Sequence, residues 1–388
     1  MRNFYLFEED SFTFVNNLKN IDLKPYKTLT FYKVNFSLDF IPKHISKVVI
    51  YENANIPLFS IPVFIKNVVL YGQKDISEIN HLELETLKIY DNELPLMICN
   101  TKSLYLEKVS NIIGFPKNLE KLKIFDCPKI NLDNLPYIKK LYLQNPDCNL
   151  DFLPSSLEKL KIKYNYKKPL RNLPNQLKTL KLEFRDKYVL DYLPNSIETL
   201  ILKYDIQFLS IPQNLKFLEI HSNDCLIDIK NTQIQEIILN CPKIINLPHN
   251  LKKLTILSNL LEINLPETLE ELIIPEKSLF NQKLILPKNL KNLIISNIFN
   301  KKIIFNDKLL YFMILCNSKF NQEIKLPDSL LNLTIIGNFR YDYELVLPKK
   351  LNSFYLGSNS YLYSLITHTH NLHFGEKNIT ILKLVFYS

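Results

Sequence analysis

The feature that most constrains this chain is a short apolar motif that recurs about every 19 residues along most of its length. Each copy opens with an apolar residue and a proline, and apolar residues follow three, six and eight positions after the proline. The clearest copies begin at Pro154, Pro174 and Pro194. Prolines mark the same phase at positions 42, 62, 116, 154, 174, 194, 212, 248, 266, 287, 327 and 348. One copy cannot bury its apolar face alone, whereas stacked copies form a continuous core, so the repeat predicts a solenoid.

The last part of each copy has the alternation of a β-strand. In the copy that begins at Pro154, Leu160 and Ile162 would face the core while Lys161 points away from it. Proline lacks a backbone donor and has a fixed φ, so we place it outside the strand. Stacked copies would then pair their strands in parallel.

A polar residue often follows this strand, eleven positions after the proline phase. We expect its side chain to be buried and to satisfy backbone groups where the coil leaves the sheet. Cys127 takes this place once. The asparagines at this place are Asn53, Asn92, Asn165, Asn223, Asn259, Asn317, Asn338 and Asn359.

Together these positions read L-x-x-L-x-L-x-x-N/C, and the chain resembles a leucine-rich repeat of the short, proline-marked kind. More narrowly, it is similar to the FNIP repeats found in social amoebae and in giant viruses of amoebae. That similarity is best in Phe280-Asn281-Gln282 and Phe320-Asn321-Gln322, while Phe299-Asn300-Lys301 keeps half of it. The general pattern covers about 23–386, and the Phe-Asn-Gln signature is confined to roughly 280–327.

The predicted fold is therefore a repeat solenoid: a leucine-rich-repeat-like horseshoe with one long parallel β-sheet on its concave side. Short, proline-marked irregular or extended segments would form the convex side. We predict an N-terminal cap at 1–22, about eighteen repeats at 23–356, an insertion loop at 357–378 and a closing strand or C-terminal cap at 379–388. The 22 residues before the first repeat are too few for the F-box that some FNIP proteins carry. A substrate-recognition role in ubiquitin ligation stays open as an alternative without a visible F-box.

Composition and charge narrow the class of protein further. The chain has 388 residues but only 5 Gly and no Trp, which argues against doubly wound nucleotide folds and P-loop enzymes and fits coding in an A+T-rich genome. No apolar window reaches the ~18 residues of a membrane span, and the N-terminus lacks the apolar stretch of a secretory signal. The 6 Cys form no CxxC pair, which favours reduced, mostly buried thiols. We expect an intracellular, cytoplasmic protein, in the host cytoplasm if the chain is viral.

No catalytic motif stands out in the sequence, and we predict a non-catalytic protein without a cofactor. The only histidine cluster is His368, His370 and His373, and the first two would share a face if the segment were a strand. Only Glu376 stands beside them as a carboxylate. A polar loop is the simpler interpretation, so we assign no metal there.

The candidate binding surface is the set of strand positions that point away from the core. Lysines alternate with tyrosines there in the middle of the chain, and apolar residues dominate later. The candidates are Lys88, Tyr105, Lys121, Lys123, Lys140, Tyr142, Lys159, Lys161, Lys181, Ile238, Ile273, Ile294, Met313 and Tyr355.

Two functions fit this surface. One is a protein-interaction scaffold, because an exposed apolar patch on a monomer usually has a partner. The other is a binder of polyanions, either nucleic acid or acidic lipid, through the Lys/Tyr patch on repeats 81–185. The formal net charge of +9 permits it. Lysine lacks the bidentate fork of arginine, and lysine-rich coding explains the charge without a ligand, so we favour the protein partner.

Overall fold

The computed structural model describes residues 11–15, 23–97, 100–127, 130–184, 188–190, 192–204, 206–208, 210–222, 227–241, 244–258, 260, 263–296, 298–315, 318–336, 341–343 and 345–356. The chain forms two compact units, Met1–Arg185 with Leu190–Pro194 and Asp186–Val189 with Asn195–Ser388. The predicted insertion at 357–378 and closing strand at 379–388 lie outside the described residues, as does most of the predicted cap at 1–22.

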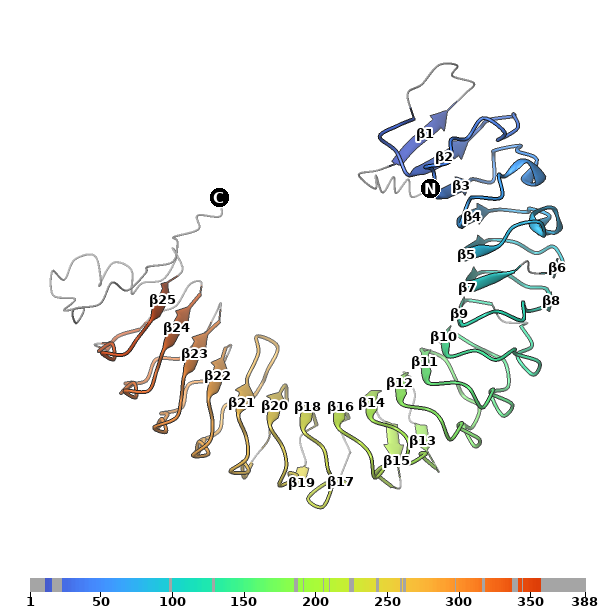
Figure 1. Cartoon of the computed structure of the whole chain (residues 1–388). Helices are drawn as coiled ribbons and strands as arrows, with labels where there is room; N and C mark the ends of the chain where they lie inside the picture. Colours follow the sequence, from blue (N-terminus) through green and yellow to red (C-terminus); the bar gives the residue numbers. More distant parts are fainter. Residues whose placement is uncertain are drawn as a thin grey trace. The chain divides into compact units, whose positions relative to one another are not determined.

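The first unit is built on a parallel sheet whose neighbouring strands follow one another along the chain (Figure 1). Its strands are β1 (Ser11–Val15), β2 (Thr28–Tyr32), β3 (Lys47–Ile50), β4 (Asn67–Tyr71), β5 (Leu84–Tyr90), β7 (Thr101–Glu107), β9 (Lys121–Phe125), β10 (Lys140–Gln144), β11 (Lys159–Lys163) and β12 (Thr179–Glu183). β1 lies within the segment predicted to be a cap and pairs with β2 as a further parallel strand.

The second unit repeats this plan, with strands paired in parallel in chain order. The strands are β14 (Thr199–Lys203), β16 (Phe217–His221), β18 (Glu236–Asn240), β20 (Lys253–Ile256), β21 (Glu271–Ile273), β22 (Asn292–Ile295), β23 (Tyr311–Ile314), β24 (Asn332–Ile335) and β25 (Ser353–Leu356). Within each unit the strands line the inner side of the curve (Figure 1).

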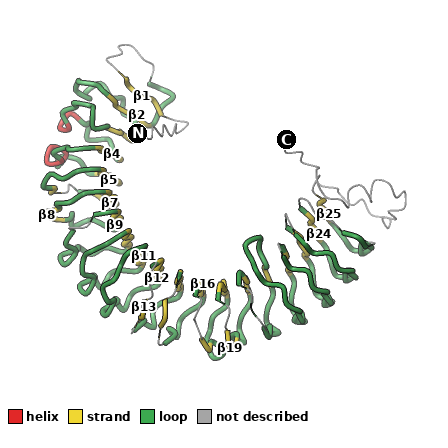
Figure 2. The backbone as a smooth tube through the Cα atoms, turned by 180° about the vertical axis from the view of Figure 1, so that it is seen from behind, coloured by secondary structure: helices red, strands yellow, loops and turns green. Residues whose placement is uncertain are grey.

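The segments that return from one strand to the next consist mostly of loops and turns (Figure 2). Their short elements are the 3₁₀ helices η1 (Leu58–Ser60) and η2 (Ile76–Ile79), and the strands β6 (Leu96–Met97), β8 (Ile112–Gly114), β13 (Tyr188–Leu190), β15 (Ile206–Phe208), β17 (Ile227–Asp228) and β19 (Ile244–Asn246). The predicted leucine-rich-repeat-like solenoid, with parallel strands and irregular or extended return segments, is confirmed.

The predicted alternation of the strands is also confirmed. Leu160 is 1% exposed and Ile162 is fully buried, while Lys161 between them lies on the opposite face. A β-turn starts at a phase proline just before the strand, as at Pro174, whose carbonyl accepts from the N–H of Leu177 at 3.0 Å. This turn uses the proline carbonyl and needs no proline N–H, which explains why proline suits the position. The same turn forms at Pro42, Pro62, Pro116, Pro154, Pro212, Pro248, Pro266, Pro287, Pro327 and Pro348.

The Phe-Asn signature has a direct structural role in the second unit. Phe280, Phe299 and Phe320 are fully buried, and their rings stack with centroids 6.1 and 6.3 Å apart. The backbone N–H of Asn300 donates to Oδ1 of Asn281, and that of Asn321 donates to Oδ1 of Asn300, each at 2.8 Å. The phenylalanines therefore join successive coils inside the core, and the asparagines join them by hydrogen bonds.

The predicted buried asparagine after the strand is found only in part. Asn92 is fully buried, and its Nδ2 donates to the carbonyl of Lys74 at 2.8 Å. Asn53 and Asn165 are exposed, so the prediction is wrong for them. In those two coils the next residue along the chain turns inward instead, and it is the buried side chain. The other predicted asparagines, Asn223, Asn259, Asn317, Asn338 and Asn359, lie outside the described residues.

Candidate functional site on the strand-lined face

In the first unit, the outward side chains of β5 to β12 form a dense group of cations, which we call the lysine face. Each of these six strands presents three outward positions in register with its neighbours. They carry two carboxylates, those of Glu107 and Glu183. The lysines at these positions are Lys88, Lys121, Lys123, Lys140, Lys159, Lys161, Lys163 and Lys181. Eight cations thus face two anions, a formal excess of six positive charges.

The register places like charges side by side. Lys140 lies directly opposite Lys121 on one side and Lys159 on the other. Strand neighbours are ~4.8 Å apart, and like charges directly opposite one another destabilise a sheet. Among the described residues, the lysines of this face that form no salt bridge with a carboxylate are Lys88, Lys121, Lys123, Lys140, Lys159 and Lys161.

Most of these lysines are half-buried, although we predicted the positions to be exposed. The physical reason is that side chains on adjacent strands cover each other's flanks. Burial, followed by the charges of Lys121 and Lys88, lowers the pKa of Lys123. The pKa of Lys161 is lowered by burial and then by the neighbouring Lys181 and Lys163. Within the lysine face, these cations repel one another.

Tyrosine rings separate some of the cations. Tyr142 lies between Lys123 and Lys161 in register, and Nζ of Lys123 and of Lys121 are 5.5 and 5.9 Å from the centroid of its ring. Nζ of Lys88 is 6.0 Å from the ring centroid of Tyr105. These cation–π contacts hold the ammonium groups in place.

One buried carboxylate lies at the end of the lysine face, on β12. Glu183 pairs with Lys181 at 2.9 Å and with Lys163 at 3.0 Å. Burial favours its protonated form, but the hydrogen bonds from these two lysines outweigh burial and lower the pKa of Glu183. The two compensated cations are therefore Lys163 on β11 and Lys181 on β12, and the other six lysines of the face have no carboxylate partner among the described residues.

A row of contacting aromatic rings, which we call the aromatic ladder and did not predict from the sequence, runs along the first unit. Its rings are Tyr32, Tyr51, Tyr71, Tyr90, Tyr105 and Phe125. The centroid of Tyr71 lies 4.6 Å from that of Tyr51 and 4.5 Å from that of Tyr90, with nearly parallel rings. Burial is the main cause that raises the pKa of Tyr71 and of Tyr105. The signal was present in the sequence, because tyrosine directly follows the last core residue of the strand in four consecutive repeats.

In the second unit, the middle outward position carries mainly apolar side chains on consecutive strands. This apolar column consists of Ile238, Thr255, Ile273, Ile294, Met313, Thr334 and Tyr355. All seven are half-buried, not exposed as predicted, for the same reason as the lysines. The structure brings together Ile238, Ile273, Ile294, Met313 and Tyr355, the candidates of the later repeats, in one line.

Charges beside the apolar column are paired. Nζ of Lys253 lies 3.2 Å from Glu271 and 3.7 Å from Glu236, one carboxylate on each neighbouring strand. Glu219 accepts a hydrogen bond from His221 at 2.8 Å and pairs with Lys203 at 3.3 Å. The bond from His221 is the main cause that lowers the pKa of Glu219. This face is therefore close to neutral.

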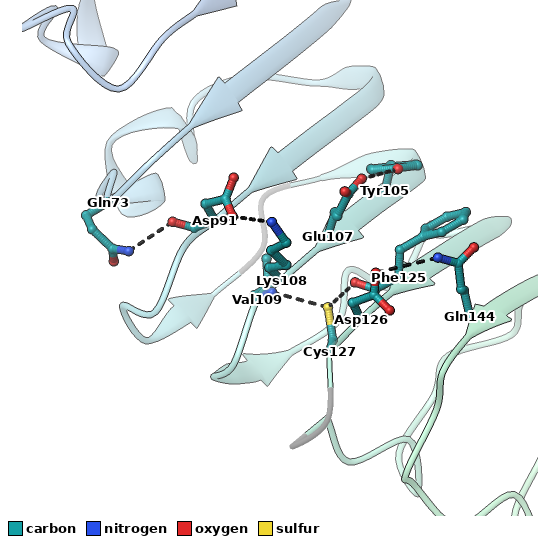
Figure 3. A network of polar contacts seen from close by, with 10 residues as sticks. All are labelled: Gln73, Asp91, Tyr105, Glu107, Lys108, Val109, Phe125, Asp126, Cys127 and Gln144. Carbon is teal, nitrogen blue, oxygen red and sulfur yellow. Dashed lines mark hydrogen bonds and ion pairs between the residues drawn. The ribbon is translucent and has the colours of Figure 1, made fainter. Parts of the chain in front are cut away.

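The buried cysteine predicted after the strand is confirmed, and it plays a structural part (Figure 3). The N–H of Val109 donates to Sγ of Cys127 at 3.2 Å, and the thiol donates to the carbonyl of Phe125 at 3.1 Å. Burial raises the pKa of the Cys127 thiol to about 11. Such a thiol links two coils and is a poor nucleophile at neutral pH.

A shallow polar hollow of about 520 Å³ lies in the second unit, lined in part by Glu270, Asn289, Lys291 and Lys308. Its lining groups bond one another: Lys291 pairs with Glu270 at 2.7 Å, and Lys308 donates to Oδ1 of Asn289 at 2.7 Å. These contacts join successive coils and leave little for a ligand to satisfy.

Neither a metal-binding cluster nor a membrane-spanning helix is found among the described residues. In the described part of the chain, no group of three or more His, Cys, Asp and Glu side chains could hold a metal ion. His368, His370 and His373 lie outside the described residues. No helix among the described residues is long and apolar enough to cross a membrane.

Comparison with known proteins supports the family and the fold. The FNIP Repeat family model matches residues 148–184, outside the range 280–327 to which we assigned the Phe-Asn-Gln signature. CroV588, described as a novel circular LRR protein, is 20% identical with a TM-score of 0.61 over 87% of this chain, which spans 63% of the length of CroV588. YopM from Yersinia enterocolitica WA-314 is 18% identical with a TM-score of 0.50, over 90% of this chain and 83% of YopM. No curated protein matches the chain. At these identities the likeness to solved structures concerns the fold alone.

Proposed function

We propose that this FNIP/leucine-rich-repeat-type protein is a non-catalytic interaction scaffold that binds a partner protein on its strand-lined face, with the apolar column as the main contact. The observation that carries the proposal is the column itself. Isoleucine and methionine side chains stand on the adjacent strands β21, β22 and β23, and a tyrosine follows in the same column on β25. The charges beside them are paired, because Lys253 contacts a glutamate on each neighbouring strand. Burying such a surface under a partner removes apolar area from water without leaving an unpaired ion.

A protein partner fits this surface better than a small molecule. The column is a strip of a sheet, whereas small ligands are usually bound in enclosed cavities. Aromatic residues and methionine are enriched at the centres of protein interfaces, and Met313 and Tyr355 lie in the strip. Scaffolds with these repeats are generally non-catalytic. The raised pKa of the Cys127 thiol, which makes it a poor nucleophile, also supports a non-catalytic role. We place the protein in the cytoplasm, of the host cell if it is viral.

The test compares two pairs of substitutions in the full chain. Ile273→Asp with Ile294→Asp places two carboxylates in the column, and we expect it to abolish partner capture from cell lysate, as measured by quantitative mass spectrometry. Ile285→Asp with Ile304→Asp is the matched control, since these isoleucines are 82% and 75% exposed and lie off the strands. A partner held by the column should also be retained at high salt. Equal capture by both variants, or equal loss, would contradict the proposal.

A further inference from the structure

We propose that the lysine face of the first unit is a second docking surface, and that its occupant is an acidic, extended polypeptide segment. This inference goes beyond the apolar column and rests on the proposed function only in taking the partner to be a protein. Its starting point is charge. The outward positions of β5 to β12 carry an excess of six positive charges, and six of their eight lysines form no salt bridge with a carboxylate among the described residues.

An anionic partner would remove a repulsion that the folded chain carries by itself. Lys121, Lys140 and Lys159 stand directly opposite one another on three adjacent strands. Carboxylates placed between them would convert like-charge contacts into ion pairs. The lowered pKa of Lys123, for which burial and then Lys121 and Lys88 are responsible, agrees with a site that favours added negative charge.

The cations are also positioned before any partner arrives. Nζ of Lys123 and Nζ of Lys121 both lie within 6 Å of the Tyr142 ring centroid, and most lysines of the face are half-buried. Side chains that are already ordered lose less conformational entropy when they bind. This arrangement distinguishes the lysine face from scattered surface lysines.

The rings of this unit argue for carboxylates and against nucleic acid. Both faces of the Tyr71 ring are covered by Tyr51 and Tyr90, and the Tyr105 ring is stacked on Phe125 and tilted against Tyr90. Bases that bind single-strand platforms need open ring faces to stack on. The outward positions of β5 to β12 also lack arginine, whose fork recognises phosphate and base edges. Nucleic acid would have to rely on phosphate contacts alone.

The length of the face sets the length of the occupant. Five steps of ~4.8 Å separate β5 from β12, so the lysines span roughly 24 Å. An extended chain advances about 3.3 Å per residue, so about seven residues cross the face. A short acidic run is therefore sufficient, and a run of four residues would reach only about half of the cations.

The experiment measures binding of fluorescein-labelled decaglutamate to the full chain by fluorescence anisotropy. We expect decaglutamate to bind more than about tenfold tighter than tetraglutamate, because it reaches more cations at once. Raising NaCl from about 50 to 200 mM should weaken binding about tenfold or more. The triple variant Lys123→Glu, Lys140→Glu, Lys161→Glu should weaken it by about tenfold or more at low salt.

A matched triple variant controls for net charge and for folding. Lys27→Glu, Lys43→Glu and Lys117→Glu change the net charge of the same unit by the same amount, at exposed positions outside the lysine face. This control should bind decaglutamate within about twofold of the unchanged chain. Circular dichroism would show that both triple variants stay folded, and a neutral Lys→Gln triple on the face should give an intermediate loss.

Three outcomes would overturn the proposal. If the control triple loses as much affinity as the face triple, the binding is general charge attraction. If a ten-nucleotide oligothymidylate, or a vesicle containing phosphatidylserine, binds the face tighter than decaglutamate, the occupant is nucleic acid or lipid. If none of these probes binds at low salt, the face is not a docking surface. The two proposals can fail separately. A face triple variant that loses decaglutamate binding but still captures the partner that Ile273→Asp abolishes would show that the two surfaces bind independently.

Discussion

The first and second units differ most on the outward face of their strands, although their cores are built in the same way. Leu160 in β11 and Leu293 in β22 occupy the same kind of buried position, and both belong to parallel strands of the same pattern. Outside the core, one unit carries uncompensated lysines where the other carries isoleucines and paired charges. The repeat thus sets the backbone and the buried positions, and it leaves the outward positions free to diverge.

Aromatic residues show the same division. The first unit stacks Tyr51, Tyr71 and Tyr90 on the strand-lined face, whereas the second unit stacks Phe280 and Phe299 inside the core. Stacking between successive coils occurs in both, because each coil repeats the position of the one before it. Neighbouring strands of a sheet lie ~4.8 Å apart, and the phenylalanine rings, which lie off the strands, are 6.1 Å apart. The stacked rings form part of the surface in the first unit and part of the core in the second.

The largest expected effect on stability comes from a charge placed in the core, and making this change once in each unit tests whether the two cores are equivalent. Leu160→Asp and Leu293→Asp each bury an unpaired carboxylate, and each should lower the free energy of unfolding by more than about 4 kcal/mol. Thermal melting followed by circular dichroism measures the loss. Lys161→Asp, one residue along on the opposite face, should change it by about 0.5 kcal/mol or less. Equal sensitivity at Leu160 and Lys161 would show that the strand faces are assigned wrongly.

The core could be predicted from the sequence because a single rule, apolar residues at alternate strand positions, repeats in every copy. Leu160, Ile162, Leu180 and Leu182 are buried as that rule requires. The turn at each proline was not predicted in detail, although its place outside the strand was.

The site could be predicted less well. The outward residues were identified, but their half-buried state depends on how side chains of adjacent strands cover each other. The pairing of Glu183 with Lys163 and Lys181 depends on cross-strand register and rotamers, which a repeat pattern does not contain. Asn53 and Asn165 were misassigned because the buried position in those coils lies one residue further along the chain.

The aromatic ladder of the first unit gives the next largest effect. Tyr71→Ala removes a ring stacked on both sides, and it should cost about 2–3 kcal/mol through lost burial and ring contacts. Urea unfolding measures the change. Tyr137→Ala is the control, since this ring is 72% exposed, and it should cost about 0.5 kcal/mol or less. A cost at Tyr71 no greater than at Tyr137 would mean that the ladder does not stabilise the unit.

A smaller effect is expected at Glu183, the buried carboxylate of the lysine face. Glu183→Gln should cost about 1–2 kcal/mol at pH 7, because Lys163 and Lys181 lose their anion. The pKa of Glu183 is lowered in the folded chain, so its contribution is present above the unfolded pKa of about 4.3 and is lost as pH falls through the folded value.

Urea unfolding at pH 7 and at pH 3 tests this prediction. The difference in the free energy of unfolding between the variant and the unchanged chain should be smaller at pH 3. Glu271→Gln in the second unit is the matched control, because its bond to Lys253 is more exposed, and it should cost about 0.5 kcal/mol. A cost for Glu183→Gln that is constant over this pH range would show that its charge contributes nothing.

The same charge reversal, made once in each unit, tests most directly whether the two faces differ in charge compensation. Lys140→Glu places an anion between Lys121 and Lys159, and it should stabilise strands β9 to β11 by about 0.5 kcal/mol. Lys253→Glu places an anion between Glu236 and Glu271, and it should destabilise β18 to β21 by a similar amount. Amide hydrogen exchange reads both regions in the full chain. We expect slower exchange in the first variant and faster exchange in the second, and a change of the same sign in both would contradict the difference in charge compensation.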